Sequence, residues 1–393
     1  MAPSSRSRLM ASAVLGQWIF GVILALLGQL FGIPGATRHA ALDLDAQARL
    51  LLTLFTGQLL FTAGAGRIVD RLGSTRVLAA GSLVMAAAVV LLAYAGGFRQ
   101  ALIAAVLMGL GGAGVNAAAN TLVSTVYGAR RGPMLNVLGV FGAAGSVSVP
   151  IVFSGVASYP QVRARLLVLG ALGAIAGVFH LLQRQPASTP AAARARGRTR
   201  AALQDPWILA LTMVLIIDFG NEAVMAGWIA PYTLAAVPAA SPTMIVGLYW
   251  GALASGRILT PLVLTRISKL VLLGIVSSVA ALGFAAISAA ATPFALGLVV
   301  LLTGLAIAPM APTALSVAGD RYEQNTGAVF GLLLSLGQLG GMIIPWSVAR
   351  VAGSAGFRTG ILVSCACGVA MAALTCSLAF RDRRAAVSAG VSR

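Results

Sequence analysis

The chain has 393 residues, of which 59% are hydrophobic and only 9% are charged, and its mean hydropathy is +0.94. Soluble domains carry about 25% charged residues, so this composition excludes an ordinary soluble enzyme or binding domain. The formal net charge of +18 would suit a nucleic-acid-binding protein, but the placement of the basic residues gives another explanation.

Long apolar segments recur along the whole chain. A run of about 20 apolar residues spans a bilayer as a helix. The sequence therefore predicts an all-α membrane protein with twelve transmembrane helices. Their approximate ranges are 9–32, 49–69, 75–95, 101–123, 133–156, 163–182, 206–229, 243–264, 269–290, 294–318, 327–349 and 357–379.

The connections between these runs alternate between two sides of the membrane. The side that carries both termini holds 20 of the 27 Lys and Arg residues, and the other side holds Arg38, Arg49, Arg99, Arg163, Arg165, Arg350 and Arg358. This bias places both termini in the cytoplasm, so the positive charge needs no nucleic-acid partner. Abundant Ala and Arg with almost no Lys are typical of a GC-rich bacterial genome, so we expect a bacterial inner membrane.

Two patterns repeat at nearly the same offset. The segment that begins at Gly57 returns 190 residues later at Gly247, and a second pattern returns at an offset of 195. The first pairs Gly66 with Gly256 and Arg67 with Arg257; the second pairs Gly142 with Gly337 and Pro150 with Pro345. The repetition predicts a duplicated unit. We expect six-helix bundles at 1–182 and 205–393, joined by a flexible cytoplasmic linker at 183–204.

The segment after the second apolar run resembles the loop between helices two and three of the major facilitator superfamily. That family has the pattern G-x-x-x-D-R-x-G, followed by basic residues. The matching residues are Gly66, Asp70, Arg71 and Gly73. This chain departs from the family where Ser74 and Thr75 replace the basic residues, and Arg76 comes one place late.

The resemblance implies a cytoplasmic gate at this loop and a fold of two pseudo-symmetric bundles. In the family the acid, here Asp70, belongs to a latch at the start of helix eleven, where a helix N-terminus favours negative charge. The repeat adds Arg257 to the gate, and Asp320 or Glu323 could pair with Arg257 or Arg76. The alternative is a tight turn with solvated charges.

The seventh apolar run carries two acids. Asp218 and Glu222 are four residues apart and share a helix face, with Asn221 beside them. An acid within a membrane span costs about 2.5–3.5 kcal/mol and usually marks a transport pathway or proton site. We expect no basic residue in mid-span to neutralise them, so burial and mutual repulsion favour proton uptake by at least one acid. The alternative is a neutral, hydrogen-bonded structural acid.

The same run resembles a subgroup of the superfamily, the fucose and glucose permease-like sugar:proton symporters. The resemblance consists of Gly220, Glu222, Gly227, Trp228 and Tyr232. It implies a sugar as the transported solute.

Polar and aromatic residues at similar depth form the expected solute site. The candidates are Gln58, Asn221, Gln338, Trp228, Tyr249 and Trp250. An amide-lined cavity without a fixed cation suits a neutral, hydroxyl-rich solute and suits a carboxylate poorly. The aromatic residues would stack on a sugar ring or close the outer side, although packing and interface anchoring are the alternatives.

These features predict a monomeric secondary transporter that moves a small polar solute through the lipid bilayer by alternating access. The coupling ion is expected to be a proton, with sodium left open, and the leading function is sugar uptake. The first alternative is a proton-coupled exporter of drugs or metabolites. The second is a membrane receptor or scaffold that transports nothing.

The sequence offers no pattern typical of an enzyme or a metal centre. Cys365, Cys367 and Cys376 lack metal-ligand spacing and are expected to be small apolar residues. His39 and His180 stand alone, so we expect structural or surface roles for both. We predict no cofactor and no catalytic residue.

Overall fold

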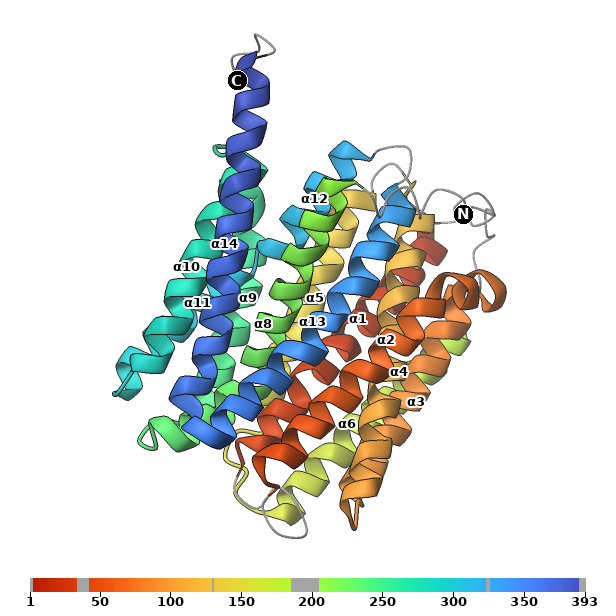
Figure 1. Ribbon diagram of the computed structural model, residues 1–393. Helices are drawn as coiled ribbons and strands as arrows, with labels where there is room; N and C mark the ends of the chain where they lie inside the picture. Colours follow the sequence, from red (N-terminus) through yellow and green to blue (C-terminus); the bar gives the residue numbers. More distant parts are fainter. Residues whose placement is uncertain (1–2, 34–41, 129–130, 185–204, 323–325, 389–393) are drawn as a thin grey trace. The chain divides into compact units, whose positions relative to one another are not determined.

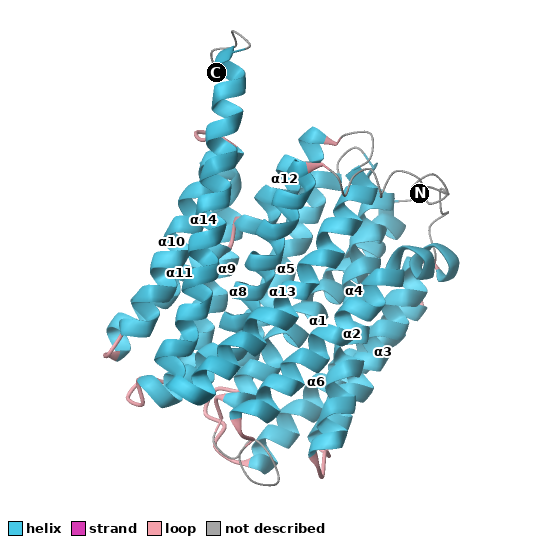
Figure 2. Cartoon of the chain, in the orientation of Figure 1, coloured by secondary structure: helices cyan, strands magenta, loops and turns pink. Residues whose placement is uncertain are grey.

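The computed structural model describes residues 3–33, 42–128, 131–184, 205–322 and 326–388. Within these ranges the regular structure is entirely helical (Figures 1 and 2). The helices are α1 (Pro3–Phe31), α2 (Leu44–Leu72), α3 (Ser74–Ala93), α4 (Phe98–Tyr127), α5 (Arg131–Val152), α6 (Tyr159–Leu181), α8 (Pro206–Ala236), α9 (Pro242–Leu264), α10 (Lys269–Ala289), α11 (Pro293–Ile307), α12 (Met310–Arg321), α13 (Thr326–Ala355) and α14 (Phe357–Ser388).

Most of these helices are long and apolar enough to cross a membrane. Ten candidate spans lie among the described residues, with α11 and α12 counted together as Pro293–Arg321. The shorter apolar part of α5 and the 23-residue α9 supply the two further helices of the predicted twelve. The predicted all-α membrane fold is therefore confirmed.

One of the predicted spans is interrupted. α11 ends at Ile307 and α12 begins at Met310, with Pro309 at the junction and Pro312 in the first turn of α12. Proline lacks a backbone N–H and cannot continue a hydrogen-bonded helix from the preceding turn. The sequence thus places a helix N-terminus inside an apolar segment.

The described chain divides into two compact units. The first unit comprises residues 1–194 with 226–250, and the second comprises 195–225 with 251–393. Helices α8 and α9 contribute to both. The predicted bundles at 1–182 and 205–393 follow from the sequence repeat and stay a prediction, and residues 185–204 of the predicted linker lie outside the described ranges.

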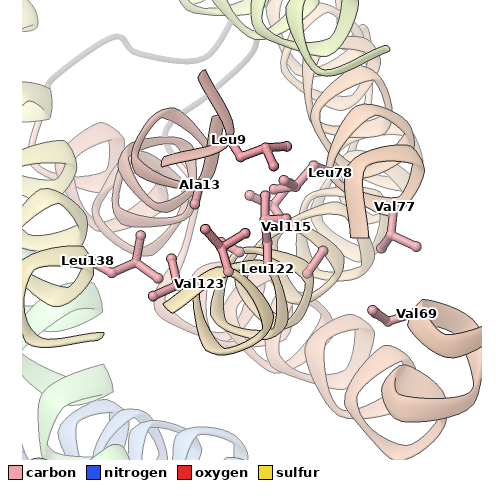
Figure 3. Packing of buried hydrophobic residues seen from close by; sticks show 12 residues of the cluster. Leu9, Ala13, Val69, Val77, Leu78, Val115, Leu122, Val123 and Leu138 are labelled. Carbon is pink, nitrogen blue, oxygen red and sulfur yellow. The ribbon is translucent and has the colours of Figure 1, made fainter. Parts of the chain in front are cut away.

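A cluster of aliphatic side chains forms part of the core of the first unit (Figure 3). Leu9 of α1, Leu78 of α3 and Val115 and Leu122 of α4 are all nearly or fully buried in it. Small residues between these side chains let the helices approach closely. In a membrane the hydrophobic effect does not drive helices together, so such close van der Waals packing stabilises their association.

The first unit also holds a close contact between α1 and the last part of α8. A Cβ added at Gly28 would lie 1.7 Å from the carbonyl oxygen of Ala226, and one at Gly32 would lie 2.5 Å from the Cβ of Ala230. Glycine is required there because any side chain would meet a neighbouring helix. Glycines four residues apart are typical of close helix contacts in membranes, and here the partner helix is α8.

In the second unit the first part of α8 packs against α13. A Cβ at Gly340 would lie 1.7 Å from the carbonyl oxygen of Ile216, and one at Gly337 would lie 3.0 Å from the ring of Phe219. α8 also contacts α14, because the Nδ2 of Asn221 donates to the carbonyl oxygen of Ser364 at 3.5 Å. The acid-bearing part of α8 is therefore held from two sides.

This packing predicts that an added methyl group on α13 destabilises the protein at one glycine and not at another. Gly340→Ala would push α13 away from the Ile216 backbone and lower the free energy of unfolding by about 2–3 kcal/mol. The matched control is Gly331→Ala on the same helix, where an added Cβ would have no neighbouring atom within 4 Å. This change would leave the free energy of unfolding unchanged or raise it by up to about 1 kcal/mol. Thermal unfolding of the detergent-purified variants measures both, and equal midpoints would contradict the close approach.

Candidate functional site

The start of α8 is fixed by a cluster of polar and aromatic groups. Asp205 accepts a hydrogen bond from the backbone N–H of Trp207 at 2.8 Å, so it caps the helix. The hydroxyl of Tyr322 donates to the other carboxylate oxygen of Asp205. The guanidinium of Arg321 lies 4.2 Å from the centre of the Trp207 ring. These contacts join the beginning of α8 to the end of α12.

Further along α8, the two acids have different surroundings. Asp218 is only 1% exposed, and neither carboxylate oxygen has a hydrogen-bond partner. Glu222 lies one turn later, and its Oε2 is 3.4 Å from the Nη2 of Arg257 on α9. The side chains of this pair are half-buried, at 17% exposure for Glu222 and 27% for Arg257.

The position of Arg257 corrects one expectation from the sequence. We expected no basic residue in mid-span to neutralise the acids, and the structure pairs Arg257 with Glu222. The physical reason is the length of the arginine side chain, whose apolar stem can run along a helix surface and carry the charge some distance from its Cα. The role of Arg257 in the cytoplasmic gate stays a prediction.

A comparison of electrostatic attraction with the cost of burying charge indicates which of the two acids has no compensating partner. Two ions at 3.4 Å attract each other by about 5 kcal/mol at an effective dielectric constant of about 20. Two charges in a membrane span cost roughly 5–7 kcal/mol together. The Glu222–Arg257 pair therefore comes close to balance, as half-buried ion pairs often do. Asp218 has no such partner, and the cluster carries a formal charge of −1 when all three groups are ionised.

The break in the predicted tenth span faces Asp218. The backbone of Ala311, in the first turn of α12, lies beside the carboxyl of Asp218. The partial positive charge of a helix N-terminus attracts a carboxylate, while the charge of Glu222 repels it. The carboxylate of Asp218 is thus repelled by Glu222 and attracted by Arg257 and by the N-terminus of α12.

Other buried polar atoms surround this part of α8. The Oδ1 of Asn221 and the Oγ of Ser364 have no hydrogen-bond partner, and both residues are at most 1% exposed. Unsatisfied buried polar atoms are costly, and they usually indicate a site where a solute or water binds. Among the described residues, no group of three His, Cys, Asp or Glu is arranged to hold a metal ion.

The remaining predicted solute-binding residues fall into both units. In the first unit, Gln58, Trp228, Tyr249 and Trp250 are almost fully buried. The Nε2 of Gln58 and the Nε1 of Trp250 have no hydrogen-bond partner. In the second unit, Gln338 on α13 is half-buried. Their role in binding a solute stays a prediction.

Ring contacts of the aromatic residues are internal to the first unit. The ring centroids of Tyr249 and Trp250 are 5.0 Å apart, and Trp228 stacks on Phe31 at 6.2 Å. Beside this stack, the Nε2 of Gln29 donates to the Oγ1 of Thr243 at 2.9 Å. This hydrogen bond links α1 to α9 and was not anticipated, since two isolated polar residues 214 positions apart carry no sequence signal.

The loop that resembles the family motif has a clear backbone requirement. Gly73 joins α2 to α3 with a φ of 86°, and its N–H donates to the carbonyl of Val69 at 2.8 Å. A positive φ of this kind requires glycine. Asp70, Arg71 and Arg76 are exposed around it, as is Gly66. Their gating role stays a prediction.

The residues that depart from the family pattern lie at the start of α3. Ser74 and Thr75 are 4% and 2% exposed there. Asp320 pairs with Lys269 at 2.5 Å, in place of the expected Arg257 or Arg76. Glu323 and His39 lie outside the described residues. His180 is fully buried and bonded through Nδ1 to the Oγ of Ser12 at 2.6 Å, in keeping with a structural role.

Comparisons with known proteins define the class. The family model described as "Major Facilitator Superfamily" matches residues 9–345. A crystal structure of a point mutant of the nucleoside transporter NupG matches with a TM-score of 0.74 and 16% identity, over 95% of this chain and 99% of that one. A bacterial homolog of the human lysosomal transporter Spinster, inward-facing and unoccupied, matches with a TM-score of 0.72 and 14% identity, over 95% and 97%. No curated protein is matched.

The helical architecture and the family match define a multi-pass membrane transporter for small molecules rather than an enzyme. The chain belongs to the major facilitator superfamily, and its fold is the one that the sequence motif implied.

The Asp205–Tyr322 hydrogen bond gives a pH-dependent prediction. Burial, followed by the hydrogen bond to Asp205, raises the pKa of Tyr322 to about 12. The folded-state pKa is above the unfolded value, so the contribution to stability is complete below about pH 10 and is lost as the pH rises towards 12. Tyr322→Phe would therefore lower the free energy of unfolding by about 1 kcal/mol at neutral pH.

Thermal unfolding of both proteins across this pH range checks the prediction. The difference between wild type and variant should be constant from neutral pH to about pH 9.5 and should shrink above pH 10. A difference that grows at high pH would show that Tyr322 does not act through its hydroxyl proton.

Proposed function

We propose that this protein is a secondary active transporter that moves a small polar organic solute, a sugar, across the membrane by alternating access coupled to protons. The observation that carries the proposal is the buried, unpartnered Asp218 one helical turn from the Glu222–Arg257 pair. Costly ionisable groups in a membrane span are rarely kept without a function.

Charge balance supports a proton as the coupling ion. Asp218, Glu222 and Arg257 carry two negative charges and one positive charge when ionised, so one proton makes the cluster neutral. A neutral cluster crosses between two conformations more easily than a charged one, because less charge is desolvated. We therefore propose Asp218 and Glu222 as the coupling acids. Sodium is the competing ion, and a requirement for it in flux assays would replace the proton.

The sugar is supported by the motif that resembles the fucose and glucose permease-like subgroup, by the buried amide groups of Gln58 and Asn221, and by the half-buried amide of Gln338. Amides donate and accept hydrogen bonds, which suits hydroxyl groups. Trp228, Tyr249 and Trp250 add aromatic surface. The repeat supports two halves that rock against each other, with a cytoplasmic gate at Gly66–Arg76.

The distribution of basic residues supports both termini in the cytoplasm. The Ala- and Arg-rich composition with a single Lys supports a bacterial inner membrane, and we propose a monomer. An exporter of drugs or metabolites would share the fold and the acids. It would respond to drugs, and not to sugars, in everted vesicles. A receptor or scaffold would give no flux in proteoliposomes for any solute, and the buried acids count against it.

Replacement of the paired acid tests the coupling. Glu222→Gln removes the titrating proton but keeps the size of the side chain, so accumulation driven by a pH gradient should be abolished while exchange of solute persists. A gradient of one pH unit supports about tenfold accumulation when one proton accompanies each solute, so the loss is readily measured. Proteoliposome uptake and counterflow assays measure the two activities separately.

Asp45→Asn is the matched control, because Asp45 also forms an ion pair, with Arg49 at 2.7 Å, but lies exposed at the start of α2. It should leave both activities unchanged. Accumulation that survives in Glu222→Gln would remove this residue from the coupling mechanism.

A further inference from the structure

The contact of Arg257 with Glu222 uses only part of the hydrogen-bonding capacity of the guanidinium. A guanidinium has five N–H donors in a planar fork and binds a carboxylate through two parallel hydrogen bonds of about 2.7–2.9 Å. Here a single Nη2 lies 3.4 Å from a single oxygen of Glu222, and the arginine side chain is 27% exposed. The contact holds the charge pair together without using the fork, so a better-placed oxyanion could compete for the guanidinium.

We infer that the transported solute carries an oxyanion group, a carboxylate or a phosphate, which binds Arg257 in place of Glu222. The inference rests on the proposed function and makes its substrate class more specific: a hydroxylated acid rather than a neutral sugar. Two features of the sequence favour a neutral solute: the resemblance to the sugar symporters, and the expectation of no fixed cation in the cavity. With Arg257 beside Glu222, the second reason no longer holds.

Among the described residues, the charged groups around the pair come from few elements. α8 supplies Asp218 and Glu222, and α9 supplies Arg257. Of the contacts that the described residues show here, α12 presents the backbone of Ala311 and α14 presents Ser364. α11 packs on α9 with Leu305 and Ala308 at Gly256, next to Arg257. α13 packs on α8 with apolar Ile344 at Gly220 and with glycine at Ile216. Arg257 is therefore the cation that this part of the second unit offers to an oxyanion.

The exchange also explains how a proton would accompany the solute. Glu222 takes a proton from water and becomes neutral, so Arg257 is released. The oxyanion then forms the bidentate pair with the guanidinium. One proton and one monoanion enter together, and the site has the same net charge before and after. Release of the solute lets Glu222 lose its proton and pair with Arg257 again.

This account differs from neutral sugar symport in its response to voltage. A proton with a neutral sugar moves one net charge, which is worth about 2.3 kcal/mol per 100 mV. A proton with a monoanion, such as a sugar carboxylate, moves none. Uptake of such an acid should therefore respond to a pH gradient and not to an imposed inside-negative potential. A phosphate ester in its dianionic form would carry net negative charge inward with one proton, so the same potential would slow its uptake.

The test uses the purified full chain and matched sugars: D-glucose, D-glucuronate and glucose 6-phosphate, with galactose, galacturonate and galactose 6-phosphate as a second series. Thermal stabilisation and binding are measured at pH 6 and pH 8. We expect at least one acid of a series to bind more tightly than its neutral sugar, and more tightly at pH 6. A carboxylate source and a phosphate source are distinguished by which acid binds.

Variants separate the role of Arg257 from general folding. Arg257→Gln should weaken binding of the acid by at least about tenfold, as loss of a charge-assisted bidentate pair predicts, and Arg257→Lys should restore only part of it. Glu222→Gln should make binding tight at both pH values. The double variant Arg257→Gln/Glu222→Gln is uncharged at this pair and controls for misfolding. Arg266→Gln, an exposed arginine after α9, should have no effect.

The outcomes separate the inference from the proposed function. An acid that binds through Arg257 and enters proteoliposomes under a pH gradient, without acceleration by voltage, supports both. Binding and voltage-sensitive uptake of a neutral sugar, unaffected by Arg257→Gln, would overturn the inference and leave the proposed function intact. If none of the six compounds binds or is taken up under a pH gradient, the inference is wrong and the sugar proposal falls with it.

Discussion

The structure depends on the cost of placing ionisable groups inside an apolar helical segment. Asp218 and Glu222 lie on the same face of α8, and Arg257 is the basic residue among those described that offsets them. Each uncompensated charge costs about 2.5–3.5 kcal/mol in a membrane span. This is a large fraction of the stability of a typical protein. In the proposed transport cycle, the cluster offsets this cost by holding a proton or by exchanging its charges with a solute.

The helices around the cluster hold it in place through close backbone packing rather than large side chains. α13 approaches α8 at Gly340, and α14 meets Asn221 through Ser364. Prolines 309 and 312 break the predicted tenth span and direct the start of α12 toward Asp218. The start of α8 is in turn capped by Asp205 and joined to Tyr322. Local features of the sequence thus position acids that have no strong partner of their own.

Patterns with a local physical cause were predictable from the sequence. Apolar runs predicted the membrane-spanning helices. The spacing of Asp218 and Glu222 placed them on one face. The contact of Arg257 with Glu222 was not predictable, because a long side chain on another helix leaves no periodic signal. Its repeat partner Arg67 is exposed, so the repetition pointed to the wrong environment.

The most direct test of the central claim is infrared spectroscopy of the purified protein near neutral pH. A protonated carboxyl has a C=O stretching band that an ionised carboxylate lacks. The account predicts such a band in the wild type, and its loss in Asp218→Asn with the band retained in Asp45→Asn. If no protonated carboxyl band is present, or if it is unchanged in Asp218→Asn, the cluster balances its charge in another way and the coupling mechanism is contradicted.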